Sequence, residues 1–186
     1  MPVGLKPSSQ QIEVSFSSTA TAASYTSKRI DLQLNPLDQE VFVVTAVKID
    51  IDAIGTAPLN LFGAGGAGNN RLYGGQVALT RNERATAISN LGENTCFATA
   101  SSKLGSSEES QAGGDYAVAY SLQENNSDTP SDLEYLAIIA TNDFYLNVES
   151  ARNDAPANMN ARLWGFRAQA DASTFAALTQ SELLSA

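Results

Sequence analysis

A period of two in hydrophobicity runs through residues 41–54, VFVVTAVKIDIDAI. The odd positions are apolar or β-branched up to residue 51, which predicts a strand with that face on a core. The even face is expected to be covered at first and exposed to water at its end, because its residues change from apolar to polar in the order Phe42, Val44, Ala46, Lys48, Asp50 and Asp52. A strand of this length needs a large sheet to pair with, so the segment indicates an all-β sandwich or barrel.

Shorter alternating segments predict further strands, at residues 11–16, 29–34, 76–81, 95–100, 115–123, 144–148 and 161–168. Residues 133–141 are almost continuously apolar, which predicts a central strand buried on both faces. Asn142 and Asp143 follow directly and favour a tight hairpin turn, since both residue types tolerate positive φ. Residues 83–91 fit a strand or a short helix equally well, and that choice stays open.

Several connecting segments have the composition of loops. Residues 17–24 are small and polar, residues 55–75 contain seven glycines, and residues 101–114 are polar with three glycines. Residues 35–38, NPLD, predict a turn with proline at its second position. The strands on either side of that turn form either a hairpin or a corner between two sheets.

The sum of eight or nine strands predicts an all-β, antiparallel two-sheet sandwich. A length of 186 residues suits one such domain. We divide the chain into an extended N-terminal arm at residues 1–10, the sandwich at 11–171, and a short C-terminal helix at 172–186. Ser173 is the expected cap of the helix.

The C-terminal helix is a candidate contact surface between subunits. At 100° per residue, Phe175 and Leu183 fall on one side, Leu184 lies nearly opposite Phe175, and Glu182 interrupts the side toward Leu178. One flank cannot bury all of these side chains. The helix therefore either covers one end of its own core or meets a neighbouring subunit, and the expected interface residues are Phe175, Leu178, Leu183 and Leu184.

Charge and composition exclude some classes of partner. The net charge is -9 with only 11 Lys and Arg, which argues against a nucleic-acid surface. Charged residues make up 17%, below the roughly 25% of typical soluble domains. This low share reflects either the host's composition or a surface buried against neighbours. The N-terminus has no pattern of a signal peptide, and no apolar run of about 18 residues predicts a membrane span.

The chain lacks the side chains of the commonest catalytic sites. It has no histidine and one cysteine, Cys96, so neither an internal disulfide nor a thiolate or imidazole zinc site can form. Nucleophiles activated by histidine are excluded as well. Cys96 is expected to be a buried small hydrophobe. We expect no enzyme, no catalytic residues, no cofactor and no dedicated metal site.

Three local patterns have both a functional and a structural interpretation. Residues 63–68 match G-x-G-x-x-G, but no helix pattern follows them, which favours a surface loop over a dinucleotide site. Asp50 and Asp52 match the first and third positions of an EF-hand calcium loop, but Leu61 occupies the twelfth position, where glutamate is required. The EF-hand interpretation therefore fails, and the two remaining interpretations are a weak cation site of another kind and an exposed strand end. The aromatic residues on predicted strands form either a sugar-stacking platform or part of an ordinary core. They are Trp164, Phe166, Tyr116, Tyr120, Tyr135 and Tyr145.

The arrangement of these segments resembles a known class of structural proteins. It combines an arm, the strands IDLQL and VFVVTAVKIDID, the segment YLAIIATNDFYLNV, a closing ARLWGF strand and a terminal helix. These features are similar to small single jelly-roll capsid proteins of icosahedral viruses, or to β-sandwich proteins that decorate phage capsids. A tail-associated β-sandwich would look much the same.

The resemblance implies that the two-sheet sandwich is a jelly roll and that the protein is a virion structural protein that acts by self-assembly. Its partners would be other copies of itself and other virion proteins, and the particle would assemble in the host cytoplasm. The alternative is a ligand-binding β-sandwich, of the carbohydrate-binding or adhesin-like kind.

Overall fold

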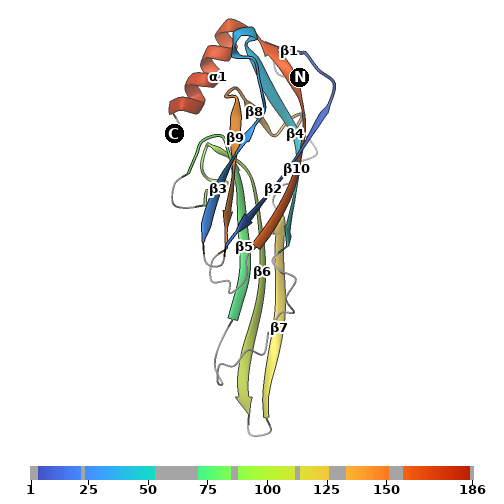
Figure 1. Cartoon of the computed structure of the whole chain (residues 1–186), viewed down its shortest axis with the longest axis vertical. Coiled ribbons are helices and arrows are strands. Elements are labelled where there is room, and N and C mark those ends of the chain that lie inside the picture. Colours follow the sequence, from blue (N-terminus) through green and yellow to red (C-terminus); the bar gives the residue numbers. More distant parts are fainter. Residues whose placement is uncertain are drawn as a thin grey trace.

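The computed structural model describes residues 4–21, 24–52, 71–84, 88–111, 114–125, 133–150 and 157–184. For residues 52, 71–74, 103–111, 114–125 and 157 it describes the backbone alone. The described chain forms two antiparallel five-stranded sheets and one helix near the C-terminal end (Figure 1).

The first sheet, called sheet A, has the strand order β1-β10-β4-β8, with β2 also paired to β10. Its strands are β1 (Leu5–Pro7), β2 (Ile12–Ala20), β4 (Glu40–Asp52), β8 (Ala137–Ile139) and β10 (Ala157–Ala170). The second, sheet B, has the order β3-β9-β5-β6-β7. Its strands are β3 (Tyr25–Asp31), β5 (Arg71–Thr80), β6 (Cys96–Gln111), β7 (Gly114–Asn125) and β9 (Asp143–Glu149). A 3-10 turn η1 (Pro36–Asp38) and the helix α1 (Ala172–Leu184) complete the described elements.

The strands pair in a nested order. β2 pairs with β10, β3 with β9, β4 with β8, and β5 with β6, and successive pairs alternate between the two sheets. A long antiparallel hairpin that rolls up into two facing sheets gives this order, which is the jelly-roll arrangement. The predicted all-β two-sheet sandwich is therefore confirmed. β1 extends sheet A beside the end of β10, and β7 adds a fifth strand to sheet B.

The core-facing side of β4 changes parity at Thr45. The register with β10 runs from Ala46 opposite Trp164 to Val44 opposite Gly165, so Thr45 is an extra, bulged residue. The main core cluster accordingly takes even residues before the bulge and odd residues after it, namely Phe42, Val44, Val47, Ile49 and Ile51. The prediction of one continuous odd core face is wrong for this reason, because a single inserted residue reverses the alternation.

A second apolar cluster lies on the opposite face of sheet A at the start of β4. Val41 and Val43 belong to it, and Phe175 and Leu178 of α1 pack against it. The helix thus covers the part of β4 whose two faces are both apolar. The exposed end of the strand is as predicted, since Lys48 and Asp50 are exposed.

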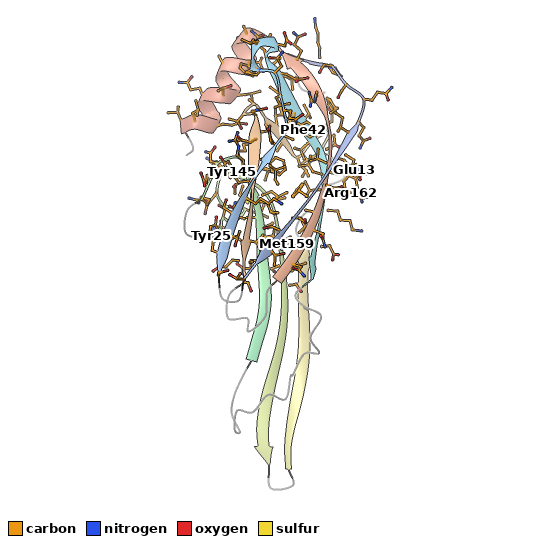
Figure 2. All side chains as sticks on the ribbon, in the orientation of Figure 1. Glu13, Tyr25, Phe42, Tyr145, Met159 and Arg162 are labelled. Carbon is orange, nitrogen blue, oxygen red and sulfur yellow. The ribbon has the colours of Figure 1, made fainter. Side chains whose placement is uncertain are left out.

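The main core fills the space between the sheets. Phe42 and Met159 are fully buried there (Figure 2). The ring of Phe144 makes edge-on contacts with those of Phe16 and Phe97, at centroid distances of 5.3 and 6.0 Å. Such contacts join β2, β6 and β9, so both sheets contribute to one core.

Gly165 lies where β10 passes the bulge, and it is the basis of a stability prediction. A Cβ atom there would lie 2.3 Å from the carbonyl oxygen of Val43 and 2.4 Å from a ring carbon of Phe42. Gly165→Ala is therefore expected to lower the free energy of unfolding by about 1–3 kcal/mol, measured by urea denaturation. Gly92→Ala is the control, because its Cβ would meet only the Asn90 side-chain oxygen. Equal losses in the two variants would contradict this account.

The apolar segment 133–141 does not form the predicted central strand. Only residues 137–139 are a strand, β8, at the edge of sheet A, and Leu133 is 54% exposed. The predicted hairpin at Asn142 and Asp143 is also wrong, because β8 belongs to sheet A and β9 to sheet B. Asn142 instead helps to close this end of the sandwich. Its backbone oxygen and Oδ1 accept hydrogen bonds from the N–H groups of Leu32 and Leu34.

Several predicted loops are strands. Residues 17–20 belong to β2, 71–75 to β5, and 101–111 and 114 to the paired strands β6 and β7. These segments lack an apolar alternation, and backbone pairing over a long register defines them instead. The loop predicted at 55–70, including the glycine motif at 63–68, lies outside the described residues.

The remaining predictions concern turns and chain ends. The segment 35–38 forms η1 and links β3 of sheet B to β4 of sheet A. Of the two predicted alternatives for the flanking strands, the corner between two sheets is therefore confirmed and the hairpin is wrong. The described part of 83–91 is neither strand nor helix. Within the predicted N-terminal arm, Leu5–Pro7 pairs with β10 as β1.

Asp171 caps α1 in place of the predicted Ser173. Its Oδ1 accepts hydrogen bonds from the N–H of Thr174 and the hydroxyl of Ser173, both at 2.7 Å. The hydroxyl of Ser173 is the larger cause that holds the pKa of Asp171 below its ordinary value. An N-cap residue precedes the first helical residue, and its side chain accepts a hydrogen bond from the backbone N–H three residues later. Asp171 meets both conditions, whereas Ser173 lies inside the helix.

Candidate functional site

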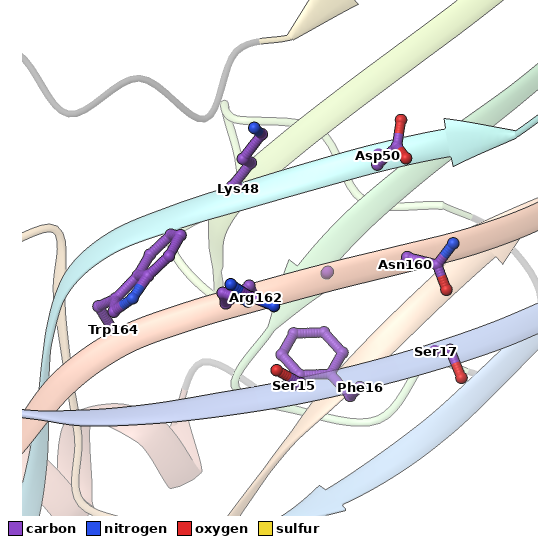
Figure 3. Close-up of a pocket in the computed structure, with 9 residues that line it drawn as sticks. Ser15, Phe16, Ser17, Lys48, Asp50, Asn160, Arg162 and Trp164 are labelled. Carbon is purple, nitrogen blue, oxygen red and sulfur yellow. The ribbon is translucent and has the colours of Figure 1, made fainter.

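The outer face of sheet A carries a polar array across three strands. Alternation directs Val47 and Leu163 into the core and leaves their neighbours on the outer side. The register places Asn160 of β10 between Ser17 of β2 and Asp50 of β4. The next outward position along β10, Arg162, lies between Ser15 and Lys48 in the same way. Residues about 150 positions apart in the sequence thus share one surface (Figure 3).

This surface is hollowed into an open groove of ≈ 650 Å³. Trp164 stands at one end of the groove and Asp50 and Asn160 at the other (Figure 3). The lining comes from β2, β4 and β10 and consists of Ser15, Phe16, Ser17, Lys48, Asp50, Asn160, Ala161, Arg162 and Trp164. The groove therefore combines the indole of Trp164, and Phe16 whose ring also packs against Phe144 of the core, with several short or charged polar groups.

Glu13 holds the aromatic end of the groove in place. Its Oε2 accepts a hydrogen bond from Nε1 of Trp164 at 3.2 Å, and its Oε1 pairs with Nε of Arg162 at 2.9 Å. The Arg162 guanidinium lies 6.0 Å from the centroid of the Trp164 ring, at the outer limit of a cation–π contact. The side chains of Glu13 and Arg162 are both about half exposed, so their ion pair adds little stability. The role of Glu13 is to orient the indole ring of Trp164 through the hydrogen bond.

The other end of the groove offers polar groups that are free to bind a ligand. Among the described residues, none forms a hydrogen bond or an ion pair with the side chains of Lys48, Asp50 or Asn160. An ammonium group donates, a carboxylate accepts, and an amide does both. This end of the groove can therefore hydrogen-bond a ligand that carries both donors and acceptors.

The described part of the chain contains neither a cluster of metal ligands nor an exposed thiol. No group of three His, Cys, Asp or Glu residues there is placed to hold a metal ion. The weak cation site at Asp50 and Asp52 stays a hypothesis, because the Asp52 side chain is not among those described. Cys96 is buried, and burial raises the pKa of its thiol, which keeps it protonated and unreactive.

The predicted interface residues of α1 divide into two pairs. Phe175 and Leu178 pack against the second apolar cluster of their own chain. Leu183 and Leu184 are 66% and 77% exposed, and both border an apolar hollow along the helix that Phe175 also lines. The helix thus covers one end of its own fold and leaves two leucines in water.

Glu182 is a buried acidic residue whose role the sequence pattern did not predict. It is 2% exposed, and its carboxylate accepts hydrogen bonds from the N–H groups of Ala140 at 3.0 Å and Thr141 at 2.9 Å. The guanidinium of Arg81 lies 3.9 Å from the same carboxylate. The sequence signal for this role is an acidic residue among the apolar positions of a helix, which in the helical projection only interrupts the apolar side.

The aromatic residues do not form one platform. Trp164 lies in the groove, Phe166 and Tyr135 pack against the second apolar cluster, and Tyr145 lies on β9 in sheet B. The side chains of Tyr116 and Tyr120 are not described. Of the members of this set whose side chains are described, only Trp164 lines the groove.

Comparison with known proteins gives no assignment. No protein-family model matches the chain, and no curated protein matches its sequence significantly. Within the described residues, no helix is long and apolar enough to cross a membrane.

Proposed function

We propose that the protein is a virion structural subunit, a capsid shell or capsid-decorating protein that acts by self-assembly. The main support is β7, a long strand at the end of sheet B whose second edge pairs with no described strand. The jelly roll is an architecture that many viral capsid proteins use. The partners would be further copies of the chain and other virion proteins, assembled in the host cytoplasm.

Sheet B extends well beyond the sandwich (Figure 1). β9 pairs with β5 only over residues 76–80, and β5 pairs with β6 as far as Ser106. β6 and β7 remain paired to the end, where Gln111 lies opposite Gly114. The end of the sheet is therefore a two-stranded ribbon among the described residues. Such a ribbon is marginally stable in water without a further partner.

The middle of β7, between Asp115 and Glu124, lacks two common protections of an edge strand. No described strand pairs with its second edge. Residues 116–123, YAVAYSLQ, contain neither a charge nor a proline, which are two of the features by which proteins prevent edge-to-edge pairing. Alternate positions in this segment are Tyr, Val, Tyr and Leu. An edge of this kind favours strand addition from a second copy.

The double variant Val118→Lys/Tyr120→Lys tests the proposal. Two positive charges on an open edge are expected to prevent pairing, so light scattering should report a particle or oligomer for the native chain and a monomer for the variant. The control Gln10→Lys/Gln169→Lys makes the same change in charge at exposed positions outside β7 and should assemble normally. A native chain that stays monomeric at high concentration, or a double variant that assembles like the control, would contradict the proposal.

The exposed flank of α1 is the second proposed contact. Burying a leucine contributes about 1.5–3 kcal/mol, and a symmetric assembly repeats each contact many times. In the same light-scattering experiment, Leu183→Gln/Leu184→Gln should fold normally and assemble at higher protein concentration than the native chain.

A further inference from the structure

We propose that the groove on the outer face of sheet A binds an oligosaccharide chain. Trp164 would stack on the apolar face of one sugar ring, and Asp50, Asn160 and Lys48 would hydrogen-bond hydroxyl groups further along the chain. The groove lies on the face of sheet A, whereas the proposed assembly edge is β7 of sheet B. This inference therefore does not depend on self-assembly.

The state of Trp164 supports stacking. Glu13 already accepts the only hydrogen bond that the indole can donate, so the ring has no further polar requirement. What it offers to a ligand is its flat apolar surface. A sugar ring presents C–H groups on one face and hydroxyl groups around its rim, and this shape matches an aromatic ring with polar groups beyond its edge.

The polar end of the groove matches the rim of a sugar. Each hydroxyl group both donates and accepts, and the groove supplies an acceptor in Asp50, a donor in Lys48 and both in Asn160. Trp164 and Asn160 are four residues apart on β10, about 13 Å along the strand. A ligand that touches both ends must therefore be longer than one sugar ring.

The charges of the groove favour an uncharged chain. Lys48 and Asp50 have opposite signs, and Glu13 pairs with Arg162. These four groups sum to zero, so neither an anionic nor a cationic polymer gains a net attraction. A peptide strand would bind preferentially along a sheet edge, by backbone pairing, and this groove lies across the face of three paired strands.

The groove contains the only tryptophan of the chain, which gives a direct measurement. Selective excitation of tryptophan reports on Trp164 alone. We would titrate the protein with cellohexaose, maltohexaose and chitohexaose as probes, and follow the emission of Trp164 together with the heat of binding by calorimetry. At least one probe is expected to give a saturable change in emission and a matching heat.

Variants separate the two ends of the groove. By calorimetry, Trp164→Ala should abolish binding, while Asp50→Ala and Asn160→Ala should each weaken it by about fivefold to tenfold. Gln169→Ala is the control, an exposed residue on β10 outside the groove, and should bind normally. Circular dichroism establishes that each variant is folded.

Two results would overturn the inference. One is the absence of heat and of any emission change with all three probes at millimolar concentration. The other is binding that survives Trp164→Ala in a folded variant. The assembly-deficient Val118→Lys/Tyr120→Lys chain should bind the same probe as the native chain, so a failure of the proposed assembly remains distinguishable from a failure of the groove.

Discussion

Val47→Asp is expected to unfold the domain, whereas Lys48→Asp should leave it folded. Val47 is 6% exposed in the main core, and Lys48, the next residue of β4, is exposed. An unpaired carboxylate in an apolar core costs several kcal/mol, and the whole domain is stabilised by about 5–15 kcal/mol. Thermal unfolding followed by circular dichroism measures the difference.

Residues on either side of the bulge sharpen this test. Because the core face changes at Thr45, Val44→Asp should be as damaging as Val47→Asp although the two positions have opposite parity. A simple alternation along β4 would place them on opposite faces. If Val47→Asp and Lys48→Asp melted at the same temperature, our assignment of the two faces would be wrong.

Glu182→Ala is expected to release the end of α1 from the sandwich. The N–H groups of Ala140 and Thr141 would lose their acceptor at a buried position. Each hydrogen bond to a charged group contributes about 1.5–3 kcal/mol, so the loss of both should reach roughly 3–6 kcal/mol in urea denaturation. Amide exchange at Ala140 and Thr141 should accelerate with it.

Two variants on the same helix complete the experiment. Glu182→Gln keeps one acceptor oxygen and should lose about half as much stability, since one of the two N–H groups remains bonded. Gln180→Ala removes an exposed polar side chain and should change stability little. Unchanged exchange at Ala140 and Thr141 in Glu182→Ala would show that the carboxylate does not anchor the helix.

Assembly and ligand binding are compatible in this architecture. The edge of β7 that pairs with no described strand belongs to sheet B, and the groove occupies the outer face of sheet A. A subunit that pairs through β7 can therefore leave the groove exposed to solvent. The two proposals predict different variants and different measurements, so each can fail without the other.

The sequence by itself determined the class of fold and much of the strand pattern. Strand geometry alone sets a period of two, so a strong alternation of apolar and polar residues predicts which side chains face water. In β4, Lys48 and Asp50 are exposed and Val47 and Ile49 are buried, as this alternation predicts. The final strand, the returning strand after Asp143 and the C-terminal helix also follow from local pattern. In each case the apolar residues are close together in sequence, so local order is enough.

Only the tertiary structure decided the features that depend on distant residues. The bulge at Thr45 arises where β10 passes β4 at Gly165, more than a hundred positions away, so no local pattern could show the change of face. The burial of Glu182 depends on two backbone N–H groups between β8 and β9. The groove exists because the nested pairing brings β2, β10 and β4 together, and pairing across the whole chain carries no local signal.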